Sequence, residues 1–255
     1  MTMHTAVITG AASGIGKATA NLLRSRGYRV IGVDRRDSDV IADLSGPAGR
    51  NSMIEQVSRL CPDGIDAVVA AAGIALVPDA RATLAVNFFG AVRTLEGLRP
   101  LLARSDRPRA VTITSTAIML APNEDLVHQL LAGDEEAALA NLKVDENVAY
   151  STSKMALARW VRQAAVSREW AGSGILLNAV APGVTATPMT VPVRATAEAR
   201  EALATSTPNA VGRYAEAEEI AEVVAFLVGL QGGYLLGQNI FVDGGTDAIV
   251  RPGLI

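Results

Sequence analysis

Short apolar runs alternate along the chain with longer stretches in which apolar residues recur at helical spacing. The apolar runs predict buried strands at residues 5–9, 28–33, 40–42, 65–70, 110–114, 175–180 and 239–242. The stretches between them predict helices at residues 15–26, 49–60, 82–104, 148–170 and 217–228. Apolar strands that alternate with helices are typical of a parallel sheet covered on both faces. Right-handed crossovers then give a doubly wound α/β sheet of the Rossmann type.

Two regions interrupt this alternation. Residues 117–148 include an acidic stretch at 126–142, rich in Leu and Ala, which favours a small helical insertion. Residues 184–213 are rich in Thr, Pro and Ala and show no strand pattern. Long segments of this kind are often lids or binding loops. Without a visible linker or repeat, we expect residues 1–255 to form a single domain, with a mobile lid at 185–210.

Composition and charge narrow the range of functions. The chain has 49% hydrophobic residues and a formal net charge of -3, which argues against a nucleic-acid or membrane-surface role. Cys61 is the only cysteine, so an intrachain disulfide is impossible, as is typical of a reducing compartment. The apolar run at 67–77 is too short to span a bilayer, and the first residues do not resemble a signal peptide. We therefore expect a cytoplasmic protein. His4 and His128 show no metal-ligand spacing, so we expect no metal site.

Tyr150 and Lys154 lie four positions apart in a predicted helix and therefore share one face. An ammonium and an oxidised nicotinamide near a phenol would lower its pKa below the usual value of about 10. Such a phenol could act as a proton donor and acceptor near neutral pH. An exposed helical tyrosine beside a solvated lysine remains the alternative when the pair is taken alone.

A glycine pattern follows the first predicted strand and begins the first predicted helix. Gly10, Gly14 and Gly16, with Ser13 and Ile15 between them, would allow a tight turn and a close approach to a pyrophosphate. The helix N-terminus would supply free N–H groups and positive potential. The alternative is an ordinary glycine-rich turn between a strand and a helix. The strand before the pattern and the helix after it favour dinucleotide binding.

Asp34 ends the second predicted strand, where a carboxylate can hold both ribose hydroxyls of the adenosine. The same carboxylate would repel a 2′-phosphate, which favours NAD over NADP. Arg35 and Arg36 leave this choice open, because either could pair with a 2′-phosphate, and Arg35 could instead stack on the adenine.

Two further segments continue the expected path of a dinucleotide. Asp43 and Leu44 follow a short strand, and the Asp43 carboxylate can accept a hydrogen bond from the adenine amino group. Ala72 and Gly73 follow the fourth strand, where small residues let the backbone approach the ribose. Each could instead be a packing residue.

In this order, these residues resemble the short-chain dehydrogenase/reductase family. The resemblance extends from Thr9 to Gly245. It includes the glycine pattern, Asp34, Asp43, residues 71–73, Asn87, Ser115, Tyr150, Lys154, Pro182, Gly183 and residues 242–245. So many ordered matches are far more specific than any one motif.

The resemblance implies four catalytic residues. Tyr150 would be the general acid in carbonyl reduction and the general base in alcohol oxidation. Ser115 would hydrogen-bond the substrate oxygen, and Lys154 would bind the nicotinamide ribose and lower the pKa of Tyr150. Asn87 would distort its helix and hold a water in a proton relay to Lys154.

The resemblance also places a nicotinamide site after the sixth strand. Pro182, Gly183 and Val184 would face the nicotinamide, Val184 through its backbone, and Thr187 would lie near the carboxamide.

Ser115 and Tyr150 lie 35 positions apart, whereas most family members have a much shorter segment there. This long segment, with residues 41–45, 182–188 and 243–252, resembles one subgroup, the bacterial 3α-hydroxysteroid dehydrogenase/carbonyl reductases. The subgroup implies a 3-hydroxy/3-oxosteroid or related carbonyl substrate. A non-steroid alcohol or carbonyl substrate and a non-catalytic NAD-binding scaffold are the alternatives.

Family members usually associate through helices that correspond to residues 82–104 and 148–170. An insertion at 117–148 would block or remodel this interface. We therefore expect a homo-oligomer, with a dimer through the C-terminal helix and strand favoured over a tetramer. The insertion could instead form a wall of the substrate pocket.

Overall fold

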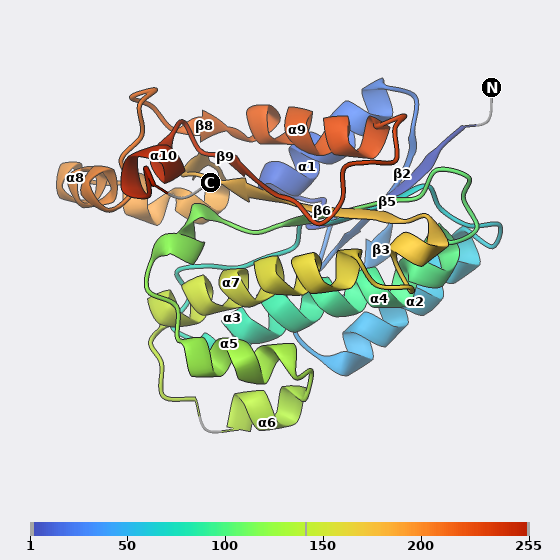
Figure 1. Cartoon of the computed structure of the whole chain (residues 1–255), viewed down its shortest axis with the longest axis horizontal. Coiled ribbons are helices and arrows are strands. Elements are labelled where there is room, and N and C mark those ends of the chain that lie inside the picture. The colour runs from blue at the N-terminus through green and yellow to red at the C-terminus, as the bar shows by residue number, and fades with distance from the viewer. Residues whose placement is uncertain (1–2, 141, 254–255) are drawn as a thin grey trace.

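A parallel sheet of seven strands lies at the centre of the computed structural model, which describes residues 3–140 and 142–253 (Figure 1). All strand pairings in the sheet are parallel, as expected for a doubly wound fold. In the order in which they pair, the strands are β3 (Val40–Ile41), β2 (Arg29–Asp34), β1 (Thr5–Thr9), β4 (Ala67–Ala70), β5 (Arg109–Ile113), β6 (Leu176–Pro182) and β9 (Asn239–Val242).

Helices cover both faces of this sheet. Figure 1 shows α1 (Gly14–Ser25) and α9 (Ala217–Gly229) on one face. The opposite face carries α2 (Pro47–Leu60), α4 (Ala91–Leu102) and α7 (Glu146–Ala165). Alternate side chains of β1 enter different cores, because Val7 packs in one apolar cluster and Ala6 and Ile8 in the other. Burial on both faces explains why the strands are continuously apolar. Among the described residues, no helix has the length and apolar character needed to cross a bilayer.

The single helix predicted at 82–104 is three segments in the structure. A short helix α3 (Ala80–Leu84) leads into a π-helix (Ala85–Gly90), which is followed by α4. Asn87 lies in the π-helix and both donates to and accepts from the Ile74 backbone. The extra residue in this turn is the helix distortion expected at Asn87. Single π-turns inside α-helices occur frequently at functional sites.

The helical insertion is present, but as two helices and not one. A 3₁₀-helix (Thr116–Met119) leads to α5 (Glu124–Leu131) and α6 (Glu135–Ala140). Gly133, with a φ of 80°, ends the first helix, and the Asp134 carboxylate accepts from the Ala137 N–H to begin the second. Residue 141, inside the predicted helical stretch, lies outside the described residues. Helix α5 packs on α7 and forms the outermost layer of that face with α6 (Figure 1).

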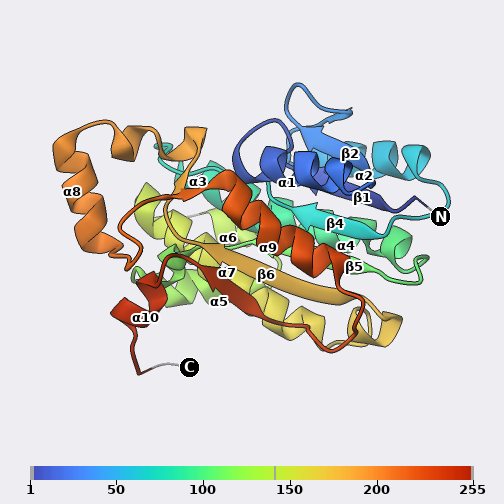
Figure 2. The same cartoon turned by 90° about the horizontal axis from the view of Figure 1, so that it is seen from above.

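The region at 184–213 contains a helix that the sequence pattern did not predict. Helix α8 (Ala197–Ser206) begins at Thr196, whose hydroxyl accepts from the Ala199 N–H, and none of its residues is buried. With no face in the core, α8 lacks the apolar periodicity that reveals a packed helix. Figure 2 shows it projecting from the end of the molecule. The region also contains a strand, β7 (Thr185–Ala186), which pairs with β8 (Ala215–Glu216). The last helix of the chain is α10 (Thr246–Val250).

Candidate active site

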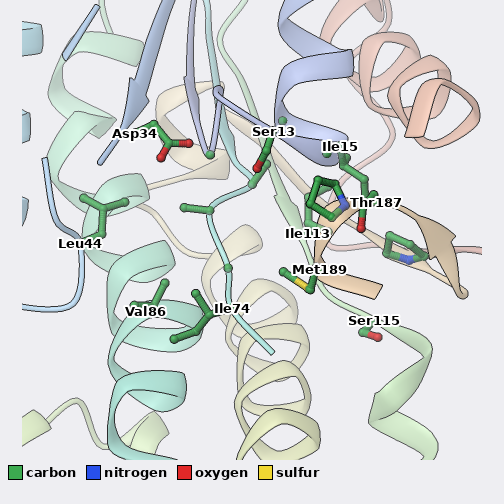
Figure 3. Close-up of a pocket in the computed structure, with 18 of the residues that line it drawn as sticks. Ser13, Ile15, Asp34, Leu44, Ile74, Val86, Ile113, Ser115, Thr187 and Met189 are labelled. Atoms are coloured by element: carbon green, nitrogen blue, oxygen red, sulfur yellow. The ribbon is translucent and has the colours of Figure 1, made fainter. Parts of the chain in front are cut away.

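A cavity of about 350 Å³ lies at the carboxyl edge of the sheet, where ligands bind in doubly wound folds. In Figure 3, Asp34 and Leu44 lie toward one end of it and Ser115 and Met189 toward the other. Most of the predicted site residues line it: Gly10, Ser13, Gly14, Ile15, Gly16, Asp34, Arg35, Asp43, Leu44, Ala72, Gly73, Ser115, Tyr150, Lys154, Pro182, Gly183 and Thr187. The fold therefore brings together residues that are distant in the sequence.

The glycine-rich turn between β1 and α1 leaves no room for side chains at two positions. Gly10 has a φ of 72°, and a Cβ there would lie 3.0 Å from the Ala71 carbonyl oxygen. A Cβ at Gly16 would lie 2.3 Å from the Gly10 carbonyl oxygen. The exposed backbone and the α1 N-terminus thus form a cradle that fits a pyrophosphate.

Thr9 joins this turn to the end of β4, a role that the sequence analysis missed. Its hydroxyl accepts hydrogen bonds from the Ala71 and Ala72 N–H groups, each at 3.1 Å. The available signal was a polar residue at the end of an otherwise apolar strand.

The Asp34 carboxylate lies at the end of β2, beside the glycine-rich turn. One oxygen accepts from the Ala12 N–H at 3.1 Å and the other from the Arg35 N–H at 2.7 Å. The side chains of Arg35 and Arg36 are both exposed, but only that of Arg35 lines the cavity. A fixed carboxylate in this position fits ribose hydroxyls.

Asp43 and Leu44 form the adenine end of the candidate site. Hydrogen bonds from Ser45 lower the pKa of the Asp43 carboxyl, with smaller contributions from the charges of Arg35 and Arg50. Asp43 is thus an ionised hydrogen-bond acceptor at neutral pH. The Leu44 side chain forms part of the cavity wall (Figure 3).

Ser115 and Tyr150 meet although 35 positions separate them. Ser115 ends the β5 segment, and its hydroxyl accepts from the Ala117 N–H at 3.1 Å. Burial raises the pKa of the Tyr150 phenol above its usual value, and a hydrogen bond to Ser115 only partly offsets this effect. The protein's own groups therefore do not produce the lowered pKa that the sequence analysis predicted. That lowering requires the positive charge of an oxidised nicotinamide.

Lys154 lies one helical turn below Tyr150 and is only 4% exposed. Its Nζ donates to the Ile113 carbonyl oxygen at 2.8 Å and lies 5.8 Å from the centroid of the Tyr150 ring. Burial lowers the pKa of Lys154 to about 8. The ammonium has a carbonyl to hold it in place and a donor left to face the cavity.

Asn87 lies directly behind this group and is fully buried. Its Oδ1 accepts from the Ile74 N–H at 2.8 Å, and its Nδ2 donates to the Ile74 carbonyl at 2.9 Å. A Cβ at Gly73 would lie 3.2 Å from Asn87 Oδ1 and 3.6 Å from Lys154 Nζ, so the two side chains face the same glycine. Asn87 does not line the cavity, and its role in a water relay stays a prediction.

At the predicted nicotinamide end, three of the four expected residues line the cavity. Pro182, Gly183 and Thr187 line the cavity, whereas Val184 does not. The Val184 carbonyl accepts from the Ala215 N–H at 3.0 Å, which ties the β7 segment to β8. A contact between the Val184 backbone and nicotinamide stays a prediction.

Part of the cavity lining is apolar and includes Ile74, Val86 and Met189, which the sequence analysis did not single out. In Figure 3, Met189 lies toward Ser115, whereas Val86 lies on the side of Leu44. Leu76 and Leu120, in segments that adjoin the cavity, are 42% and 45% exposed. The charged residues in the lining are Asp34, Arg35, Asp43 and Lys154. An apolar ligand would thus meet few charges beyond the cofactor side.

A doubly wound sheet with this site defines a nicotinamide-dependent oxidoreductase. Two family models match the chain: one described as short chain dehydrogenase matches residues 4–124, and one described as Enoyl-(Acyl carrier protein) reductase matches residues 137–247. The chain belongs to the short-chain dehydrogenase/reductase family. It is an oxidoreductase that acts on alcohols and carbonyls.

Three individual members of the family are similar to this chain over nearly its whole length. The chain is 37% identical over 259 residues to the 3-alpha-hydroxysteroid dehydrogenase/carbonyl reductase of Comamonas testosteroni, covering 98% of this chain and 99% of the relative. It is 38% identical to the crystal structure of the 3-alpha-hydroxysteroid dehydrogenase from Pseudomonas sp. B-0831 in complex with NADH, with a TM-score of 0.92 over 98% of this chain and 100% of that one. It is also 32% identical to the cis-4-hydroxycyclohexanecarboxylate dehydrogenase of Sinomonas cyclohexanicum, covering 96% of each chain.

Proposed function

We propose that the protein is an NAD(H)-dependent oxidoreductase that interconverts a 3-hydroxysteroid and a 3-oxosteroid, or a related alcohol and ketone. One observation carries the proposal. Ser115, Tyr150 and Lys154 share a single cavity with the glycine-rich turn and Asp34. Acid/base groups and a dinucleotide cradle in one cavity place a reacting carbonyl beside a hydride donor.

The residues of the chain supply the proton and the stabilisation of charge. Bound NADH would supply the hydride. Tyr150 donates its proton to the carbonyl oxygen as negative charge develops there. The Ser115 hydroxyl donates a hydrogen bond to the same oxygen. Lys154, held at the Ile113 carbonyl, binds ribose hydroxyls and replenishes the proton through a water beside Asn87. In alcohol oxidation the same groups act in reverse, with Tyr150 as the base.

Selectivity for NAD(H) over NADP(H) rests on Asp34. Its carboxylate, fixed by two backbone N–H groups, accepts hydrogen bonds from ribose hydroxyls and repels a 2′-phosphate. The NADH complex of the Pseudomonas relative supports this choice. Arg35 provides the competing charge, because it lines the same cavity.

The steroid assignment has two supports. The first is the activity of both hydroxysteroid relatives, which match nearly the whole chain. The second is the apolar share of the cavity lining, which includes Ile74 and Met189. A smaller cyclic alcohol or ketone is the second candidate, supported by the relative that acts on a cyclohexane ring.

A homodimer is the proposed assembly. Helix α5 covers α7, and Glu124 of α5 pairs with Arg159 of α7 at 2.5 Å, which leaves less of α7 free for a partner. Phe226 on α9 and Tyr234 before β9 are 56% and 100% exposed, and this C-terminal region is the proposed contact. A compact tetramer in small-angle X-ray scattering would refute the dimer.

Turnover of NADH and NADPH with a panel of 3-oxosteroids and simple ketones tests the proposal. We expect NADH-dependent steroid reduction that Tyr150→Phe lowers by about 10³-fold or more, while NADH still binds. Turnover of only the simple ketones would keep the mechanism and reject the steroid. NADH binding without turnover of any compound would favour a binding scaffold.

A further inference from the structure

A buried arginine connects the helical insertion with the adenine end of the cavity. Arg50 lies in the first turn of α2 and is 2% exposed. Its Nη1 and Nη2 contact the two Glu135 carboxylate oxygens of α6, at 2.5 and 2.9 Å. A bidentate pair of this kind fixes the orientation of both side chains as well as their distance.

Arg50 also donates to backbone carbonyls of two segments at the site, and Nη2 shares its two hydrogens among three acceptors. Nε donates to the Leu44 carbonyl at 2.7 Å, and Nη2 donates to the Ser45 carbonyl at 3.1 Å. Nη2 also donates to the Ala85 carbonyl at 2.9 Å, at the beginning of the π-helix that carries Asn87. One guanidinium thus contacts three segments: the Asp43–Ser45 loop at the predicted adenine end (the adenine loop), the π-helix and the insertion.

The adenine loop packs closely against its two neighbouring segments. A Cβ at Gly49 would lie 1.9 Å from the Asp43 carbonyl oxygen, and one at Gly90 would lie 3.2 Å from the Leu44 carbonyl. The loop therefore lies between α2 and the π-helix, and Arg50 binds it from the buried side. Its other side faces the cavity through the Asp43 and Leu44 side chains.

Glu135 is the carboxylate that balances the charge of the buried Arg50, although its own side chain is 22% exposed. A buried guanidinium that lost its carboxylate would be an uncompensated charge, and it would rearrange toward water or another acceptor. The carbonyls of Leu44 and Ser45 would then lose their donors and the loop its position. A second contact also holds α6, because the Arg81 guanidinium donates a hydrogen bond to the Leu139 carbonyl.

We propose that the insertion serves the cofactor: Glu135 and Arg50 are a positioning pair that holds the Asp43–Ser45 loop in its adenine-binding conformation. The inference rests on the proposed NADH site and extends it to a segment outside that site. It gives the insertion a role besides shielding α7 or walling the substrate pocket.

Titration of the purified full-length protein with NADH, followed by calorimetry or cofactor fluorescence, tests the pair. We expect Glu135→Gln to raise the Kd for NADH by about five- to tenfold, the size typical of a positioning network. The kcat at saturating NADH and the KM for the ketone stay unchanged. Arg50→Lys keeps the charge but loses the planar fork, so it weakens NADH binding in the same way and serves if Glu135→Gln does not fold.

Two variants in the same insertion are matched controls. Glu136→Gln changes the same charge on the exposed neighbour of Glu135. Glu124→Gln breaks a different ion pair between the insertion and the sheet-covering helices, that with Arg159. Both should bind NADH like the wild type, and thermal unfolding of every variant confirms that binding is measured on folded protein.

Three results would overturn the inference. Equal NADH binding by folded Glu135→Gln and wild type would show that the pair is purely structural. Equal weakening in Glu124→Gln would show a general effect of destabilising the insertion. A wild-type protein that binds no NADH would refute the proposed function and this inference together, which the first two results would not do.

Discussion

Two parts of the protein at the cavity differ in how firmly their residues are held. One is the wall formed by the glycine-rich turn, Asp34 and Lys154, and the other is the region at 184–213. In the wall, Thr9 fixes the end of β4, two backbone N–H groups fix Asp34, and a carbonyl fixes Lys154. In the region at 184–213, helix α8 has no buried residue. Preorganised groups bind a ligand without an ordering cost, whereas exposed segments can order upon binding. We therefore expect the cofactor side of the cavity to change little when a ligand binds, and the region at 184–213 to change more.

Burying the charged Lys154 side chain lowers the free energy of unfolding, and this cost can be measured. Its pKa of about 8 means that the folded protein releases this proton at a lower pH than the unfolded chain, whose value is 10.5. The unfolded state then binds more protons between pH 8 and 10, so this residue makes the free energy of unfolding rise with pH in that window. Lys154→Met should be more stable than wild type at pH 7 by roughly 2–3 kcal/mol, and the difference should shrink by pH 10.

Urea denaturation at a series of pH values measures this difference. Tyr150 is present in both proteins, so its raised pKa largely cancels in the comparison. Lys17→Met, at an exposed position of α1, is the control and should show no such trend. Parallel stability curves for Lys154→Met and wild type would mean that the ammonium is not desolvated.

A methyl group at Gly16 should distort the glycine-rich turn. The added Cβ would lie 2.3 Å from the Gly10 carbonyl oxygen, so the turn must shift. We expect Gly16→Ala to lower the free energy of unfolding by about 1–3 kcal/mol and to weaken NADH binding at least as strongly. Gly233→Ala is the control, because its added Cβ would meet nothing within 4 Å. Wild-type NADH affinity in Gly16→Ala would show that the turn is not the pyrophosphate cradle.

Asp34→Asn should change cofactor choice and leave the fold intact. Losing the charge weakens the hydrogen bonds to ribose, so the Kd for NADH should rise by about tenfold. Binding of NADPH should weaken less or improve, because the repulsion of its 2′-phosphate is gone. Titration of both cofactors gives the ratio, with Asp37→Asn in the same exposed loop as the control. An unchanged ratio would assign cofactor selectivity to Arg35.

The smallest expected effect concerns the lid. Trypsin should cleave the native protein after Arg200 in α8, since none of that helix is buried. If residues 185–210 order over bound ligands, NADH should slow this cleavage by roughly two- to fivefold. Mass spectrometry of timed digests locates the cut. Cleavage at the same rate with and without NADH would show that the segment is not a cofactor-linked lid.

Repeating patterns and chain order are the features that the sequence predicts best. The apolar strands, the amphipathic helices and the parallel sheet are confirmed because burial on two faces leaves a strong pattern. Helix α8 was missed because a helix without a buried face has no apolar stripe. The apolar periodicity at 82–104 predicted one continuous helix and missed the π-turn, because the extra residue depends on an Asn87–Ile74 contact. Only the family resemblance indicated a distortion at Asn87.

The candidate site divides in the same way. Gly10, Asp34, Ser115 and Tyr150 could be placed from motifs and from a family resemblance, and the fold brings them to one cavity. Ile74 and Met189 could not, and neither could the role of Thr9 within its motif, because these depend on which segments become neighbours in the fold. The motif also does not reveal that burial alone raises the Tyr150 pKa, since burial depends on packing. The lowering expected beside an oxidised nicotinamide stays a prediction.

The place of β9 in the sheet has a consequence for biosynthesis. Strand β6 is buried along its whole length, yet the neighbour that covers one of its edges, β9, comes much later in the sequence. While the protein is being made, β6 therefore has an unpaired edge until the chain has been synthesised through β9. Such an edge is a template for aggregation, and pairing between distant strands is slow. Protection of the nascent chain by chaperones should thus matter most between the synthesis of β6 and that of β9, and deleting β9 should make the product insoluble.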